Sequence, residues 1–88
     1  MDIKPFNKTG PCRTGGLKNV NINKIISVLG FGPNVADDPD KVKYSWGFTV
    51  DEVQCGIWDY KGSSDYGEFS TYGPKTIFQS LFGDEFCQ

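Results

Sequence analysis

The sequence contains no histidine. Histidine is the usual general base of serine and cysteine hydrolases and the commonest protein ligand of metal ions, so its absence argues against both chemistries. The three cysteines form no CxxC pair, which argues against a zinc site, and their odd number argues against a disulfide framework. No apolar run approaches the roughly 20 residues that a membrane-spanning helix needs, and the first residues lack the apolar segment of a signal peptide. We therefore expect a cytoplasmic, non-enzymatic protein without a membrane anchor, metal ion or cofactor.

The net charge is small, but the charged residues are unevenly distributed along the chain. The net charge is −2, yet the first 30 residues carry +4 and the rest of the chain carries −6. An acidic chain lacks the basic face of a general nucleic-acid-binding protein, so direct nucleic-acid binding is not expected. The acidic part either meets a basic partner surface or serves solubility.

Aromatic residues are abundant, and the patterning predicts an α+β fold. Tyr44, Trp46, Phe48 and Val50 alternate with small or polar residues, as in a half-buried strand. We expect an antiparallel three-stranded sheet with two short helices packed on one face. The expected helices are residues 22–29, capped by Asn21 and ended by Gly30, and a second helix that opens at Gly73-Pro74 and ends at Gly83. The expected strands are residues 42–50, 53–60 and 67–72.

The 88 residues form one domain by length. Residues 1–17 are rich in glycine, proline, lysine and threonine, which predicts an irregular N-terminal arm. Residues 18–83 form the α-β-β-β-α core, and residues 84–88 form a short acidic tail. A domain this small buries a modest share of its surface, so aromatic packing or association into a homo-oligomer is expected to support it.

The register of the central hairpin follows from a two-residue turn at Asp51-Glu52. In that register Gly47 lies opposite Gly56 on the face away from the helices. Two facing glycines predict a smooth patch, edged by Trp58 and Tyr60, that suits a protein interface or a stacking site. The alternative is that the glycines mark a bulge or a tight twist.

Three groups of charged residues are further candidates. Lys43 and Lys61 lie beside the expected aromatic patch. Asp59 falls on the core side of its strand, where it is either a structural ion pair or strand-end cap, or a catalytic acid. An acidic loop at Asp37, Asp38 and Asp40 lacks the spacing of a calcium loop and is read as a surface for a basic partner.

The block SWGFTVDEVQCGIWDYKGS is followed by FSTYGP and a helix that ends in LFG. In these segments the chain resembles small uncharacterised proteins of bacteriophages and other viruses. Those proteins also pair a tryptophan-bearing strand with a strand that ends in an IWDYK-like sequence, and the resemblance covers about residues 25–83. It implies a viral origin. Short phage proteins of this kind that are not virion parts are often counter-defence factors.

The leading hypothesis is therefore a non-enzymatic phage protein of the anti-CRISPR type. It would bind and inhibit a host immune effector in the cytoplasm of an infected cell. Trp58 and Tyr60 would be the aromatic anchors, and the acidic residues at 37–40 and 51–52 would meet a basic surface of the host protein.

Two alternatives remain open. One is an oligomeric sponge that sequesters a cyclic nucleotide messenger, with Trp58 or Tyr60 stacked on the base and Lys43, Lys61 or Arg13 on the phosphate. The other is a small carboxylate-dependent enzyme in which Asp59 is the acid.

Overall fold

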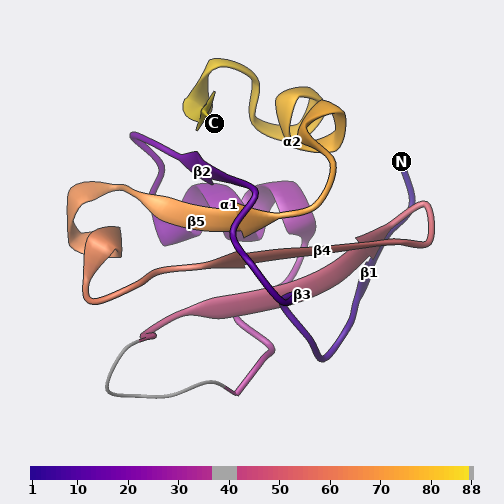
Figure 1. Cartoon of the computed structure of the whole chain (residues 1–88), viewed down its shortest axis with the longest axis horizontal. Coiled ribbons are helices and arrows are strands. Elements are labelled where there is room, and N and C mark those ends of the chain that lie inside the picture. Colours follow the sequence, from indigo (N-terminus) through magenta and orange to yellow (C-terminus); the bar gives the residue numbers. More distant parts are fainter. Residues whose placement is uncertain (37–41, 88) are drawn as a thin grey trace.

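The hairpin formed by β3 (Ser45–Val50) and β4 (Val53–Trp58) lies at the centre of the fold (Figure 1). Its register is the expected one: Gly47 pairs with Gly56, and Val50 pairs with Val53 across the turn. Asp51 and Glu52 both have positive φ, at 50° and 72°, as the central residues of a type I′ turn do. The computed structural model describes residues 1–36 and 42–87.

Within the described residues the sheet has six antiparallel strands, so the expected count of three is wrong. The strand order is β1-β3-β4-β5-β2-β6, and β3, β4 and β5 are the three that were expected. The N-terminal segment that was expected to be irregular, residues 1–17, contributes β1 and β2, and the expected tail, residues 84–88, contributes β6. These strands are two or three residues long, too short to show a period-2 pattern, and they form by pairing with distant strands. Besides β3 and β4, the sheet contains β1 (Ile3–Pro5), β2 (Gly15–Leu17), β5 (Phe69–Tyr72) and β6 (Phe86–Cys87).

The helices are α1 (Ile22–Leu29) and α2 (Lys75–Phe82). Helix α1 has the expected bounds: the Asn21 side chain accepts a hydrogen bond from the Lys24 N–H at 2.9 Å, and Gly30 ends the helix at φ 92°. Helix α2 begins one residue later than expected, because Pro74 is its N-cap and not its first helical residue. Short 3₁₀ turns lie at Ser63–Tyr66 (η1) and Gly83–Glu85 (η2).

Both helices bury their apolar faces against the same side of the sheet. The hairpin contributes Trp46, Phe48 and Ile57 to this core, and all three side chains are fully buried. The ring of Phe48 lies 6.2 Å from that of Phe78 on α2. On the side of α1, the Trp46 indole donates a hydrogen bond to the Phe31 carbonyl at 3.1 Å. The expected packing of two helices on one face is therefore present.

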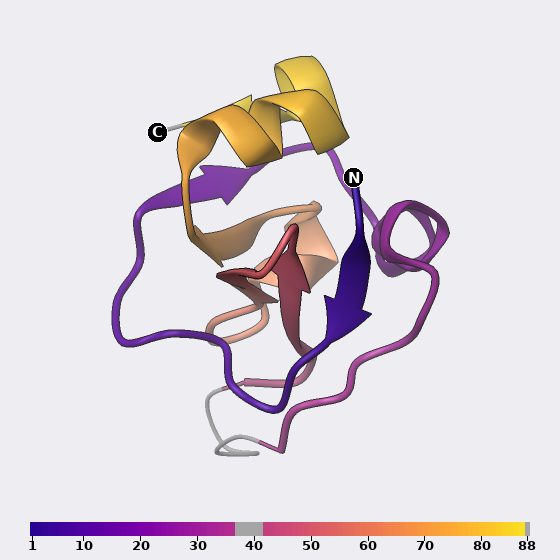
Figure 2. The same cartoon turned by 90° about the vertical axis from the view of Figure 1, so that its right-hand side faces the viewer.

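The opposite face of the sheet is covered by the chain itself. Residues 6–14, which we call the arm, link β1 to β2 and run around the side of the central strands away from α1 (Figure 2). The arm is fixed near each end, where the Phe6 N–H donates to the Gly47 carbonyl at 2.9 Å and the Thr14 N–H donates to the Thr71 carbonyl at 2.8 Å. Asn34 adds a clamp, because its side-chain amide bonds both the N–H and the carbonyl of Gly47 (3.0 and 2.9 Å) and also the Phe6 carbonyl (3.2 Å).

Candidate functional site

The facing glycines do not form an open patch, and that interpretation is wrong. Gly47 and Gly56 are buried beneath the arm. A β-carbon on Gly47 would lie under 3.0 Å from the carbonyl oxygens of Phe6 and Lys8, and one on Gly56 would lie as close to the backbone of Thr9. Glycine marks a close approach of backbone, as expected, but the approaching segment belongs to the same chain.

The two aromatic candidates lie at one end of β4 and differ in exposure. Trp58 is half-buried on the face away from the helices, between Ser45 and Ser70 in the register. Tyr60 follows the strand and is 46% exposed. Of these two candidates, Tyr60 therefore offers the larger exposed aromatic surface.

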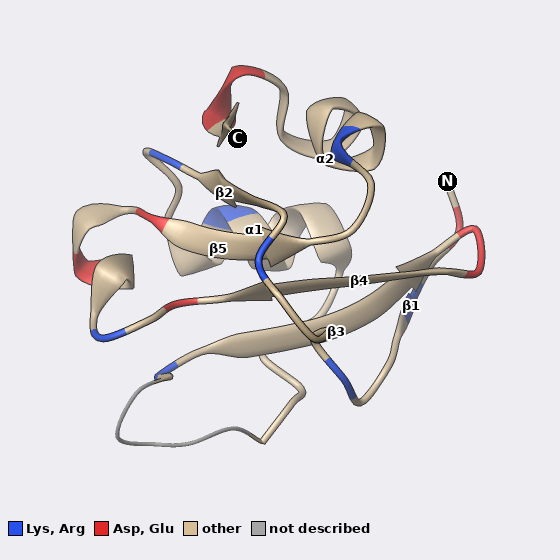
Figure 3. Ribbon diagram, in the orientation of Figure 1, with Lys and Arg blue, Asp and Glu red and all other residues tan. Residues whose placement is uncertain are grey.

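The two lysine candidates lie near the same end of the hairpin and contact tyrosines. The Lys43 ammonium is 5.9 Å from the centroid of the Tyr44 ring, and the Lys61 ammonium is 5.3 Å from the centroid of the Tyr60 ring. Both lysines are exposed. Figure 3 shows basic residues along the arm and an acidic pair at the β3–β4 turn. The acidic candidates Asp37, Asp38 and Asp40 lie outside the described residues.

Asp59 is fully buried and serves as a strand-end cap. Its Oδ1 accepts hydrogen bonds from the backbone N–H groups of Lys43 and Tyr44, at 2.8 and 2.7 Å. Its Oδ2 accepts a hydrogen bond from the Ser64 hydroxyl at 2.6 Å. The carboxylate thus ties the start of β3 to η1 through hydrogen bonds and not through an ion pair with either lysine.

Asp59 and Ser63 together fix the loop of residues 59–67, which we call the tyrosine loop. The Ser63 hydroxyl donates to the Glu68 carbonyl at 2.8 Å and accepts from the Tyr60 N–H at 3.1 Å. The loop carries Tyr66 at its end, and this side chain is 82% exposed. Sequence reasoning missed Tyr66, although a tyrosine within the small polar run KGSSDY could have indicated it.

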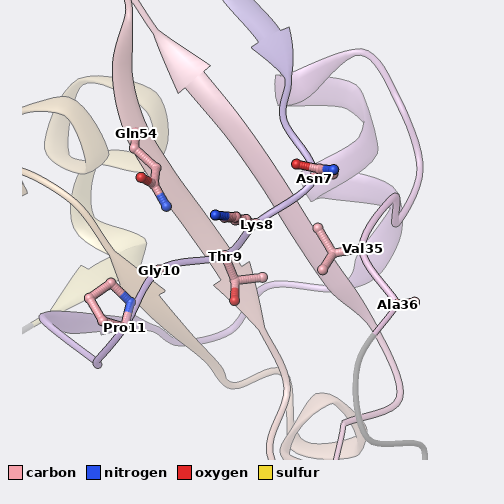
Figure 4. Close-up of a pocket in the computed structure, with 8 residues that line it drawn as sticks. All are labelled: Asn7, Lys8, Thr9, Gly10, Pro11, Val35, Ala36 and Gln54. Carbon is pink, nitrogen blue, oxygen red and sulfur yellow. The ribbon is translucent and has the colours of Figure 1, made fainter.

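Described residues line two cavities of note on the arm side of the sheet. The larger, of about 460 Å³, follows the arm where it crosses the hairpin, with Gln54 on one side and Val35 and Ala36 on the other (Figure 4). Among the described residues that line it, Lys8 is the ionisable one. The smaller cavity, of about 250 Å³, is lined by more charged and polar side chains than the larger one, and we call it the Arg13 pocket. Its lining includes Arg13, Lys18, Tyr60, Ser63, Glu68, Ser70 and Cys87.

The cysteines are free thiols of different exposure. Cys12 is exposed, and Cys55 lies in the core, where burial raises its pKa from 9.0 to about 11. A thiol with a raised pKa is a poor nucleophile at neutral pH, so Cys55 acts as a small apolar core residue. Within residues 1–36 and 42–87, no cluster of three cysteine or acidic side chains is arranged to hold a metal ion.

No protein-family model, curated protein sequence or solved structure matches this chain. In the part of the chain that the structure describes, neither helix has the length and apolar character needed to cross a lipid bilayer. The candidate site consists of the hydrogen-bonded tyrosine loop and, beside it, a small pocket lined by two cationic side chains.

Proposed function

We propose that this protein is a non-enzymatic counter-defence factor of the bacteriophage type. It acts in the cytoplasm of an infected cell, where it binds a host immune effector, such as an RNA-guided nuclease, and blocks part of its surface. The resemblance of residues 25–83 to small phage proteins supports the viral context. The binding role is supported by the tyrosine loop.

The observation that carries the proposal is that a buried carboxylate holds a loop whose tyrosines face solvent. Burying Asp59 is costly unless all its hydrogen bonds are made, and here three donors satisfy it. The ordered loop then presents Tyr60 and Tyr66, which are 46% and 82% exposed. Tyrosine is enriched among interface residues that dominate binding energy, and a rigid loop loses little entropy on binding.

The same geometry favours binding over catalysis at this site. The two oxygens of Asp59 are engaged by backbone and hydroxyl donors, and the side chain is fully buried. A general acid must reach its substrate within hydrogen-bonding distance. The exposed side chains of the loop are two tyrosines, one lysine and one aspartate (Tyr60, Tyr66, Lys61 and Asp65), which suits recognition of a partner surface with apolar and charged groups.

The proposal is tested by phage infection of bacteria that carry a CRISPR immune system. We expect the wild-type protein to restore phage plating, and the Tyr60→Ala/Tyr66→Ala double variant to lose at least about tenfold of that effect, because hot-spot truncations cost over about 2 kcal/mol. Val53→Ala is the matched control, since Val53 is 41% exposed on the other end of the hairpin. It should protect phage as well as the wild type does.

Two results would contradict the proposal. One is that the wild-type protein protects phage from none of a panel of immune systems. The other is that the double variant, shown by circular dichroism to be folded, protects as well as the wild type.

A further inference from the structure

The Arg13 pocket has a floor of main chain and small side chains. Gly16 on β2 pairs with Ser70 on β5 and with Cys87 on β6, so these three neighbours lie in one row on the face away from the helices. Gly16 has no side chain to fill the row. A shallow hollow therefore remains across three strands, with the Ser70 hydroxyl on its floor.

Arg13 is held in place over this floor. Its Nε donates a hydrogen bond to the Gly15 carbonyl at 2.9 Å, which fixes the plane of the guanidinium. A β-carbon on Gly16 would lie 2.6 Å from Nη2 of Arg13, so glycine is needed at this position for the guanidinium to lie on the sheet. An anchored guanidinium has its remaining N–H donors fixed in direction, which suits the oxygens of a phosphate or carboxylate.

The positive charge of the pocket is not neutralised by ion pairs. Among the described residues, the ion pairs are Lys4 with Asp2 and Lys24 with Glu85, and neither Arg13 nor Lys18 has a carboxylate oxygen within 4.0 Å. Glu68 also lines the pocket and is exposed, as Arg13 and Lys18 are, but in the described part of the chain it forms no ion pair with either cation. Two cations that share a hollow without a partner attract an anion.

An aromatic ring lies at the edge of the same pocket. Tyr60 lines it and is 46% exposed, with the Lys61 ammonium 5.3 Å from its ring centroid. The volume of about 250 Å³ is below the roughly 300–1,000 Å³ of sites that enclose a whole small molecule. It suits a compact anionic group, with any attached ring left at the rim.

We infer that the Arg13 pocket binds the phosphate group of a small phosphorylated ligand, held by Arg13 and Lys18, with an attached ring packed on Tyr60. This site does not depend on the partner-binding role proposed above. Tyr66 does not line the pocket. Loss of phosphate binding and loss of partner binding can therefore be observed separately, in Arg13 and Tyr66 variants.

The test is a titration of the ¹⁵N-labelled protein with four probes: inorganic phosphate, AMP, 3′,5′-cyclic AMP and adenosine. We expect saturable shifts at the amides of Gly16, Ser70 and Cys87 with the three phosphate-containing probes. The nucleotides should bind more tightly than inorganic phosphate does, because only they carry a ring for Tyr60. Adenosine should shift these amides weakly.

Matched variants identify the groups responsible. Arg13→Gln should weaken AMP binding by at least about tenfold and Lys18→Gln by about threefold, because charge-assisted hydrogen bonds are lost. Lys75→Gln on α2, the same change at an exposed lysine outside the pocket, should leave it unaltered. Glu68→Gln should tighten AMP binding, since it removes a negative charge from the rim.

Several results would overturn the inference. They are the absence of shifts at the pocket amides with every probe, equal binding of adenosine and AMP, and equal weakening by Lys18→Gln and Lys75→Gln. Weaker binding in Glu68→Gln would also contradict an anion site.

Discussion

Gly56→Ala is expected to destabilise the fold, although alanine is normally at least as favourable as glycine within a strand. Gly56 does not have a positive φ, so its backbone imposes no penalty on alanine. The obstacle is the arm, because the new methyl group would overlap the carbonyl group and α-carbon of Thr9. Backbone atoms cannot rotate away as the end of a flexible side chain can.

The arm cannot move freely, because it is fixed on both sides of Thr9. Its anchors are the Phe6–Gly47 and Thr14–Thr71 hydrogen bonds. Overpacking of this kind costs about 1–3 kcal/mol, and each lost hydrogen bond adds about 1 kcal/mol. For a domain of this size, each kcal/mol lowers Tm by about 4–8 °C.

Urea denaturation and trypsin digestion together test this expectation. Gly32→Ala is the matched control, since a β-carbon at Gly32 meets no atom within 4 Å; its unfolding free energy should change by less than about 0.5 kcal/mol. Trypsin should cut after Lys8 and Arg13 faster in Gly56→Ala than in wild type, because the arm is displaced. Equal stability and equal digestion of the two variants would refute the packing of the arm on the hairpin.

Two further predictions concern the turn and the core thiol. Glu52→Gly should stabilise the protein by about 0.5–1 kcal/mol in urea denaturation, because residue 52 has φ 72°, whereas Glu52→Ala should give no such gain. In the folded protein, burial raises the pKa of the Cys55 thiol from 9.0 to about 11. The buried neutral thiol therefore makes its full contribution to the free energy of unfolding below pH 9, and this contribution is lost as pH rises toward 11. The stability deficit of Cys55→Ala relative to wild type should accordingly shrink from about pH 8 to about pH 11; an unchanged deficit would show that the thiol is not shielded from solvent.

The features that the sequence predicts correctly are those encoded locally. The register of the hairpin follows from the alternation of residues 44–50 and a two-residue turn, and α1 follows from its Asn21 and Gly30 caps. A strand-end cap at Asp59 was one of the interpretations of the sequence, and the hydrogen bonds of its carboxylate show this role.

The features that were missed depend on pairing between distant segments. Strand β2 lies beside β5 and β6, which are more than 50 residues away along the chain, and its GGL sequence has no period to detect. The glycine pair indicated a close backbone approach, but nothing in the local sequence identified the arm as the approaching segment. The lining of the Arg13 pocket likewise comes from distant segments, which include β2, β5, β6, the arm and the tyrosine loop.

The most direct test of the proposed function is site-specific photo-crosslinking in infected cells in which the protein protects phage from the immune effector. A photoreactive phenylalanine analogue would replace Tyr66 in one variant and Val53 in another, since both side chains are exposed but lie at different ends of the hairpin. We expect position 66, and not position 53, to crosslink to a subunit of the immune effector. Crosslinking from position 53 alone, or none from position 66 while protection persists, would contradict a partner-binding role for the tyrosine loop.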